Sequence, residues 1–264
     1  MSIIIKLFKI LQNLKLLIMK YQIITIILFI IFSCTNEENY ENKFVYISGK
    51  VTDFENNPIE KVKVAIKNKD FKDIYQTETN NKGNYSIKVK KSKYFALYAI
   101  KESDYGKTKL EYWAWNIPAF NNLEINPQYN NLEIYGVHIF EPKIKPNDTY
   151  RIYLRPMSLK KFKQMDNTKD TINILPILKK DEIKIEINNK NVEIKTLDRI
   201  LEFNTTNKYI YAYELQVLKP KINTKKFFDK ITIKINSLET QEKGKSDYFF
   251  IKKDLYNQMI INKL

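Results

Sequence analysis

The stretch of sequence that decides the fold runs from Ile47 to Val89 and reads ISGKVTDFENNPIEKVKVAIKNKDFKDIYQTETNNKGNYSIKV. Short runs rich in β-branched and aromatic residues alternate in it with turn residues, such as Asn56-Asn57-Pro58. Between 61 and 67, three apolar side chains alternate with lysines and Ala65, as in a strand with one buried face. Gly83 supplies the positive φ that a tight turn commonly requires. We therefore expect strands joined by tight turns.

One more strand extends this pattern. Residues 94–101 are apolar on both faces, which predicts a central strand. The apolar spacing and the turn residues of 47–53, 57–59 and 77–87 together resemble those of the carboxypeptidase regulatory-like domain.

This resemblance implies a transthyretin-like, immunoglobulin-like β-sandwich of seven strands at residues 44–157. Residues 150–156 would supply the final strand, and residues 106–146 would be an inserted loop or hairpin. Domains of this family are accessory modules without catalytic activity and occur in many outer-membrane and surface proteins. The resemblance therefore implies a scaffold rather than a peptidase.

The second half of the chain also reads as β structure. Residues 158–180 are Lys-rich, with Leu159, Phe162 and Met165 at roughly helical spacing, and are predicted to form a linker or short helix. From 181 to 264, isoleucines alternate with polar residues in several short runs, and Asn188-Asn189-Lys190-Asn191 reads as a hairpin turn. We expect a second small antiparallel sandwich at 181–264 and, for the chain as a whole, an all-β fold after an N-terminal signal helix.

The N-terminus predicts export and lipidation. Residues 21–33 are almost wholly apolar and, as a helix, would reach only about 20 Å, which suits a signal peptide at 1–33 better than a membrane span. Met19 and Lys20 make a short basic start before this segment, so translation from Met19 is an alternative to Met1. An uncleaved anchor is the competing interpretation, but Lys15 and Lys20 would lie inside it.

Cys34 is the sole cysteine and follows Ile31-Phe32-Ser33, which resembles the lipobox of bacterial lipoproteins. Cys34 is therefore the predicted lipidation site, and the polar residues 34–43 are the predicted tether to a membrane. Glu37 and Glu38 look like an export signal of surface lipoproteins. The expected location is the cell envelope, at the outer membrane, with surface exposure as one possibility.

Composition excludes several classes of function. The formal charge of +15 is spread along the chain and comes almost entirely from lysine, so directed nucleic-acid recognition is not expected. His138 is the only histidine, and the five glycines are far apart, which argues against a zinc enzyme and a Gly-rich phosphate loop. No cofactor or metal is expected, and the chain is predicted not to be an enzyme.

Four aromatic residues of the predicted insertion form a candidate ligand platform: Tyr112, Trp113, Trp115 and Phe120. Packing into the core is the simpler interpretation of the same residues. The leading function is a lipid-anchored envelope protein with binding or spacer modules for a glycan or an envelope protein. One alternative is a carbohydrate-active enzyme or a glycan-binding surface protein that uses the aromatic residues of the insertion. Acids such as Asp53, Asp104 and Glu111 could in principle form an acid/base pair, but ordinary surface acids are the simpler interpretation. Another alternative is an accessory subunit of an outer-membrane transport or secretion system.

Overall fold

The computed structural model describes residues 43–143, 148–166, 168–203, 207–221, 226–252 and 256–257. The predicted signal peptide, the predicted lipidation site Cys34 and all but the last residue of the predicted tether lie outside the described residues. Within the described part of the chain, no helix is both long and apolar enough to span a membrane. Residues 45–264 belong to one compact unit.

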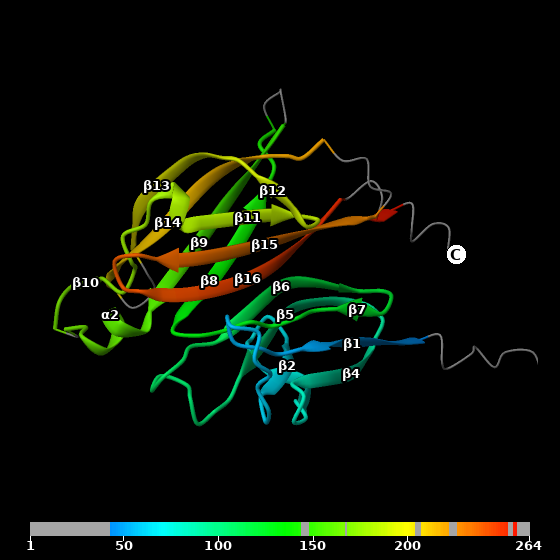
Figure 1. The fold of residues 1–264 in the computed structure, drawn as a ribbon. Coiled ribbons are helices and arrows are strands. Elements are labelled where there is room, and N and C mark those ends of the chain that lie inside the picture. The colour runs from blue at the N-terminus through cyan, green and yellow to red at the C-terminus, as the bar shows by residue number, and fades with distance from the viewer. Residues whose placement is uncertain are drawn as a thin grey trace, which may run out of the picture. The chain divides into compact units, whose positions relative to one another are not determined.

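The expectation of an all-β protein is confirmed (Figure 1). In the first half of the chain the strands are β1 (Phe44–Lys50), β2 (Lys63–Lys67), β3 (Asp73–Glu78), β4 (Asn84–Lys90), β5 (Ser92–Ile100), β6 (Tyr112–Ala119), β7 (Leu123–Glu124), β8 (Leu132–Phe140) and β9 (Thr149–Ser158). After the short helix α2 (Leu159–Lys163) follow β10 (Thr171–Ile172), a 3-10 turn (Lys180–Glu182), β11 (Ile183–Ile187), β12 (Lys190–Val192), β13 (Ile194–Phe203), β14 (Tyr209–Leu218), β15 (Phe228–Ser237) and β16 (Glu242–Ile251).

The described strands form three sheets. The largest has eight strands in the order β12-β11-β15-β16-β6-β5-β2-β3, and the smallest has the order β4-β1-β7. The third has the order β10-β14-β9-β8, with β13 paired to β14. β5 lies between β2 and β6, so the prediction that residues 94–101 form a central strand is confirmed.

The deciding stretch packs one half of the large sheet onto the small sheet. Val64 and Ile66 of β2 are fully buried, as are Ile47 of β1 and Val89 of β4. Gly83 has a φ of 74°, and a Cβ there would lie 2.5 Å from the carbonyl oxygen of Val51, so the turn before β4 requires glycine.

Strands from the two halves of the sequence share sheets, which differs from the expectation of a separate second sandwich at 181–264. β16 pairs in parallel with β6, and β14 pairs with β9. The hairpin predicted at 188–191 is present between β11 and β12, and both Asn188 and Asn189 have positive φ. The local turns are therefore as expected. The strands, however, pair between the two halves of the chain, which two independent domains would not do.

The segment 106–146 also differs from the expected insertion. It contributes β6 to the middle of the eight-stranded sheet and β8 to the sheet that covers the other half. Apolar side chains on both faces of β6 are buried, and on one of these faces Trp113 and Trp115 pack against Tyr135 of β8. A strand with two buried faces belongs in the core, and removing it would open both layers.

Candidate functional site

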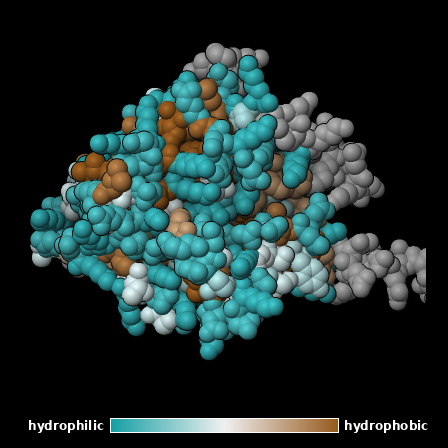
Figure 2. Space-filling model, viewed as in Figure 1, coloured by the Kyte–Doolittle hydropathy of each residue, from teal (hydrophilic) through white to brown (hydrophobic). Residues whose placement is uncertain are grey.

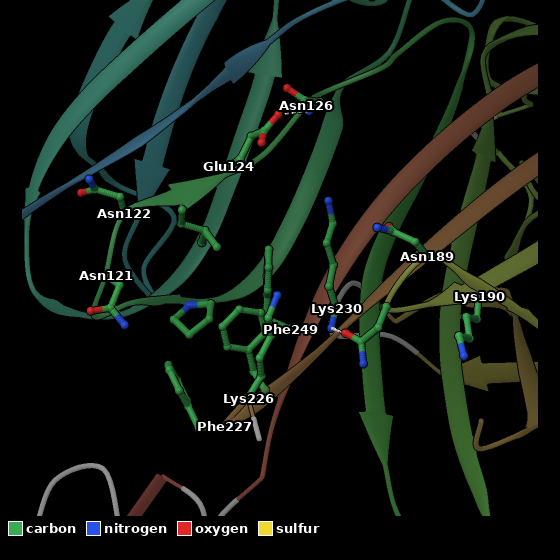
Figure 3. Close-up of a pocket in the computed structure, with 14 residues that line it drawn as sticks. Asn121, Asn122, Glu124, Asn126, Asn189, Lys190, Lys226, Phe227, Lys230 and Phe249 are labelled. Atoms are coloured by element: carbon green, nitrogen blue, oxygen red, sulfur yellow. Dashed lines mark hydrogen bonds between the residues drawn. The ribbon is translucent and has the colours of Figure 1, made fainter. Parts of the chain in front are cut away.

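A polar cleft of about 930 Å³ opens beside the junction of β6, β7, β15 and the β11–β12 turn. Figure 3 shows Asn121, Asn122 and Asn126 on one side of it and Asn189 and Lys190 on the other. The full lining is Pro118, Asn121, Asn122, Leu123, Glu124, Asn126, Asn188, Asn189, Lys190, Lys226, Phe227, Phe228, Lys230 and Phe249. Its volume is in the range of ordinary ligand sites.

Asparagines precede and follow the two-residue strand β7, and their hydrogen bonds to β1 hold this side of the cleft in place (Figure 3). The side-chain oxygen of Asn122 accepts from the backbone N–H of Tyr46 at 2.9 Å, and that of Asn126 accepts from Lys50 at 2.8 Å. These bonds extend the pairing of β1 beyond the short strand. The Nδ2 of Asn126 donates to Glu124 at 2.8 Å. Among the described residues, the Nδ2 of Asn122 has no acceptor, so it is available as a donor at the cleft wall.

Three lysines and one carboxylate give the cleft a positive balance. Lys190 and Lys226 are exposed and form no ion pair among the described residues. Lys230 is held in place, because its Nζ lies 3.3 Å from Oδ2 of Asp247. The single lining carboxylate, Glu124, already accepts a hydrogen bond from Asn126. An anionic ligand is therefore the electrostatic match for this cleft.

Asp247 is a structural group beneath the cleft. It is fully buried, accepts from the hydroxyl of Tyr112 at 2.6 Å and also accepts from Thr232. Burial by itself would raise the pKa of Asp247, but Lys245, Lys230 and the two hydroxyl donors hold that pKa below its ordinary value. The carboxylate is ionised and satisfied, so its role is to orient Lys230 and join β6, β15 and β16.

Phenylalanine rings form the apolar end of the cleft. Phe249 is fully buried and lies edge to face against Phe228, with ring centroids 5.5 Å apart. Phe227 packs edge to face on Phe120 at 5.8 Å. Phe227 and Phe228 are half-buried, and such rings offer flat apolar surface to the face of a sugar or to an apolar side chain, whereas Phe249 supports Phe228 from below.

The structure does not bring the four predicted platform residues together. Phe120 backs the cleft through Phe227, whereas Tyr112 is buried and bonded to Asp247. Trp113 and Trp115 stack on each other at 5.0 Å on the opposite face of β6 and are 4% and 5% exposed. The burial of the two tryptophans agrees with the core-packing interpretation, and no shared surface of four rings is present.

A second cavity of about 310 Å³ lies on the side of β6 that faces β8. It is lined by Tyr105, Glu111, Glu133, Tyr135, Arg155, Pro156, Met157, Ile174, Ile210 and Tyr211. The indole Nε1 of Trp113 donates to Oε1 of Glu133 at 2.9 Å. Burial, followed by the charge of Glu111, raises the pKa of Glu133 to about 8.

The other acids considered from the sequence have local roles. Asp53 accepts from the backbone of Glu55 and Asn57 and shapes the turn after β1. Asp104 lies 3.8 Å from Lys109 in the loop before β6, and only Glu111 enters the second cavity. His138 is exposed beside Tyr153. Among the described residues, no group of three or more His, Cys, Asp or Glu side chains is placed to hold a metal.

Sequence reasoning missed Glu133 and Arg155. A signal for Glu133 is present in the sequence, since it is a single charge within the apolar run Leu132–Phe140. Such a charge in a buried strand requires a partner or a function. The position of Arg155 depends on a β-bulge in β8, which the period-two pattern does not reveal.

Comparisons with known proteins identify no family. No family model matches the chain, and no curated protein matches it. Among solved structures, a form of BcpA, the major pilin subunit of Bacillus cereus, is 11% identical with a TM-score of 0.25, over 79% of this chain and 69% of that one. A DUF3823 family protein from Bacteroides ovatus is 9% identical with a TM-score of 0.24, over 77% and 98%. At these scores the likenesses establish neither a shared fold nor a shared function, and the resemblance of residues 47–87 to the carboxypeptidase regulatory-like domain stays a prediction.

Proposed function

We propose that this chain is a lipid-anchored protein of the cell envelope that binds an acidic sugar chain in the polar cleft and performs no catalysis there. The observation that carries the proposal is the composition of the cleft, which combines three lysines, five asparagines and three phenylalanine rings with one carboxylate. Lysines attract anionic groups, amides bond hydroxyls, and rings cover the apolar face of a sugar. A single carboxylate occupied by Asn126 does not supply an acid and a base for glycoside cleavage.

The shape of the cleft supports a chain rather than a single sugar. Its volume is about three times that of the second cavity, and its walls come from the segment around β7 on one side and the β11–β12 turn on the other. The two exposed lysines, Lys190 and Lys226, are free of ion pairs among the described residues and would contact successive acidic groups.

Neutralising these two lysines is expected to weaken binding of an acidic glycan selectively. For the double variant Lys190→Gln/Lys226→Gln, we expect the Kd for hexagalacturonate to rise about tenfold, since two exposed charge contacts contribute about 1.4 kcal/mol together. Isothermal titration calorimetry at low and high salt measures this, and salt should weaken wild-type binding because exposed charges are screened.

A matched control keeps the change in net charge constant. Lys82→Gln/Lys160→Gln removes two exposed lysines that do not line the cleft and should leave the affinity unchanged. Maltohexaose tests the requirement for negative charge. Equal binding of the neutral and acidic chains, or equal effects of the two double variants, would contradict the proposal.

Anchoring is tested separately at the predicted lipidation site. Because Cys34 is the only thiol in the chain, Cys34→Ala should abolish incorporation of labelled palmitate and release the protein from the membrane fraction. Thr35→Ala is the control and should retain the label. Label that persists in Cys34→Ala would show that the protein is not anchored through this residue.

A further inference from the structure

The second cavity contains two buried polar atoms that the protein itself leaves without partners. Oε2 of Glu133 and Nε of Arg155 have no hydrogen-bond partner among the described residues, although both side chains line the cavity. Glu133 is only 4% exposed. Buried polar groups are rarely left unpaired, because each such group costs about 1–3 kcal/mol. One carboxyl oxygen and one guanidinium nitrogen without partners at the same cavity therefore indicate a missing polar partner.

Asp247 and Glu133 are both buried, but their pKa values are shifted in opposite directions, so burial alone does not explain the raised pKa of Glu133. Asp247 is equally buried, but hydroxyl donors and lysines surround it and its pKa is lowered. Glu133 receives hydrogen bonds from the indole of Trp113 and from the backbone of Glu111, but its Oε2 has no partner among the described residues, and burial raises its pKa. The first carboxylate is satisfied within the fold, whereas the second is satisfied only if something enters the cavity.

The position of Arg155 is built into the backbone. β8 carries a register irregularity between Tyr135 and His138, and Gly136 within it has a φ of 60°. A Cβ at Gly136 would lie 3.0 Å from Nε and from Nη2 of Arg155, so the bulge and the glycine make room for the guanidinium. Arg155 then lies over the ring of Tyr135, with 5.5 Å from Cζ to the ring centroid.

Aromatic rings form the apolar walls around these polar groups. Tyr105, Tyr135 and Tyr211 line the cavity. Tyr135 is supported from behind by Trp113 and Trp115, whose centroids lie 5.6 Å and 5.5 Å from its own. Phe71 stacks on Tyr135 at 6.2 Å although its φ of 59° is strained for a bulky residue. The ring of Tyr135 is therefore fixed by its neighbours, and Tyr105 and Tyr211 complete the aromatic lining of the cavity.

We propose that this cavity binds one neutral, polyhydroxylated ring, the size of a single sugar, with its hydroxyls on Glu133, Glu111 and Arg155 and its apolar face on a tyrosine ring. The volume of about 310 Å³ is at the small end of ligand sites and suits one ring rather than a chain. A hydroxyl both donates and accepts, so one hydroxyl of the ring accepts from the guanidinium N–H of Arg155, and another accepts from the protonated carboxyl group of Glu133.

The charges in and around the cavity favour a neutral ligand over a cation. Below about pH 8 Glu133 is protonated, so the cavity does not hold two ionised carboxylates, and the guanidinium of Arg155 adds a positive charge to it. The titratable and charged groups around the two carboxyls are Tyr105 from the loop before β6, Tyr135 from β8 and Arg155 from β9. Lys67 and Asp73 also act on Glu111. This site is distinct from the lysine-lined cleft and does not depend on the function proposed for that cleft.

Tryptophan fluorescence gives a direct readout, because both tryptophans of the chain stack beside the cavity and one of them is bonded to Glu133. Titration with methyl pyranosides (glucoside, galactoside, mannoside and N-acetylglucosaminide) should give a saturable change with at least one of them, with a Kd of roughly 1 mM or tighter. Binding should weaken above pH 8, where ionised Glu133 no longer donates a hydrogen bond. Butylammonium and choline, as cationic probes, should give no saturable change.

Variants separate this site from a merely structural arrangement. Tyr105→Ala removes a wall residue that is 48% exposed, so the fold should survive while the affinity falls about tenfold. Tyr46→Ala, at 47% exposure and outside the cavity, is the matched control and should bind normally. Glu133→Gln should retain binding and lose its dependence on pH between 7 and 9, because the amide keeps a donor and an acceptor without titrating.

Three results would overturn the proposal. The first is the absence of a saturable response to every pyranoside in the folded wild-type protein. The second is a response to butylammonium or choline that exceeds the response to the sugars, which would make the cavity a cation site. The third is equal loss of binding in Tyr105→Ala and Tyr46→Ala. None of these results bears on hexagalacturonate binding in the cleft, so the two proposals fail independently.

Discussion

Replacement of Asp247 by alanine is expected to lower the free energy of unfolding by about 3–5 kcal/mol, because it removes the buried carboxylate that pairs with the ammonium group of Lys230. The same change removes the acceptor of the Tyr112 and Thr232 hydroxyls, which lie on the neighbouring strands β6 and β15. Urea denaturation at pH 7 measures the loss. Glu193→Ala, which breaks an exposed ion pair with Lys195, is the control and should change stability by less than about 1 kcal/mol.

The contribution of Asp247 also has a defined dependence on pH. Its pKa in the folded protein lies below the ordinary value, whereas in the unfolded chain it is about 3.9. The charge therefore stabilises the fold above about pH 4, and this stabilisation is lost as pH falls through the folded pKa. The difference between wild type and Asp247→Ala should shrink in acid. A difference that is constant from pH 7 to pH 2 would show that the carboxylate charge is not what stabilises the network.

Gly49→Ala is expected to destabilise the protein by about 3 kcal/mol or more, because the new methyl group collides with backbone. A Cβ at Gly49 would lie 1.8 Å from the carbonyl oxygen of Ile125 and 2.8 Å from Oδ1 of Asn126. The carbonyl of Ile125 cannot move away easily, since it accepts from the buried hydroxyl of Tyr85 at 2.7 Å. Chemical denaturation and thermal melting measure the effect.

The control for Gly49 is a glycine with a different constraint. Gly106 has a φ of 68° but open space where a Cβ would lie, so Gly106→Ala carries only conformational strain of about 1–2 kcal/mol. If the two variants lose the same stability, the close approach of β1 to the segment after β7 is not what requires Gly49.

Local features of the chain were predictable because local chemistry controls them. The hairpin at Asn188 and Asn189 and the turn at Gly83 follow from residues that tolerate positive φ. The central position of β5 follows from apolar side chains on both of its faces. Glu111 was recognised as a candidate acid, although Asp104, considered with it, proved to shape a loop.

The sequence did not predict which strands pair with each other or which residues meet at the candidate sites. The alternation of apolar and polar residues predicts which face of a strand is buried. It does not predict the neighbouring strand, because backbone hydrogen bonds are the same for every sequence. The residues of β6 therefore do not indicate that it pairs with β16. The aromatic residues predicted as one platform at 112–120 do not share a surface, because successive residues of a strand point to opposite faces of the sheet. Tyr112 therefore bonds to Asp247 on one face and Trp113 to Glu133 on the other.

The sequence by itself determined that this protein is built of strands, where most of them turn, and which residues cannot be exchanged for others at those turns, because these properties depend on side chains a few positions apart. Only the tertiary structure decided that both halves of the chain share one large sheet and that Lys190 and Asn122 face one cleft. It also placed Oε2 of Glu133 and Nε of Arg155 at one cavity, without a hydrogen-bond partner among the described residues. These arrangements depend on contacts between residues far apart in the chain, and the choice among such contacts is made by packing and hydrogen bonding of the whole molecule.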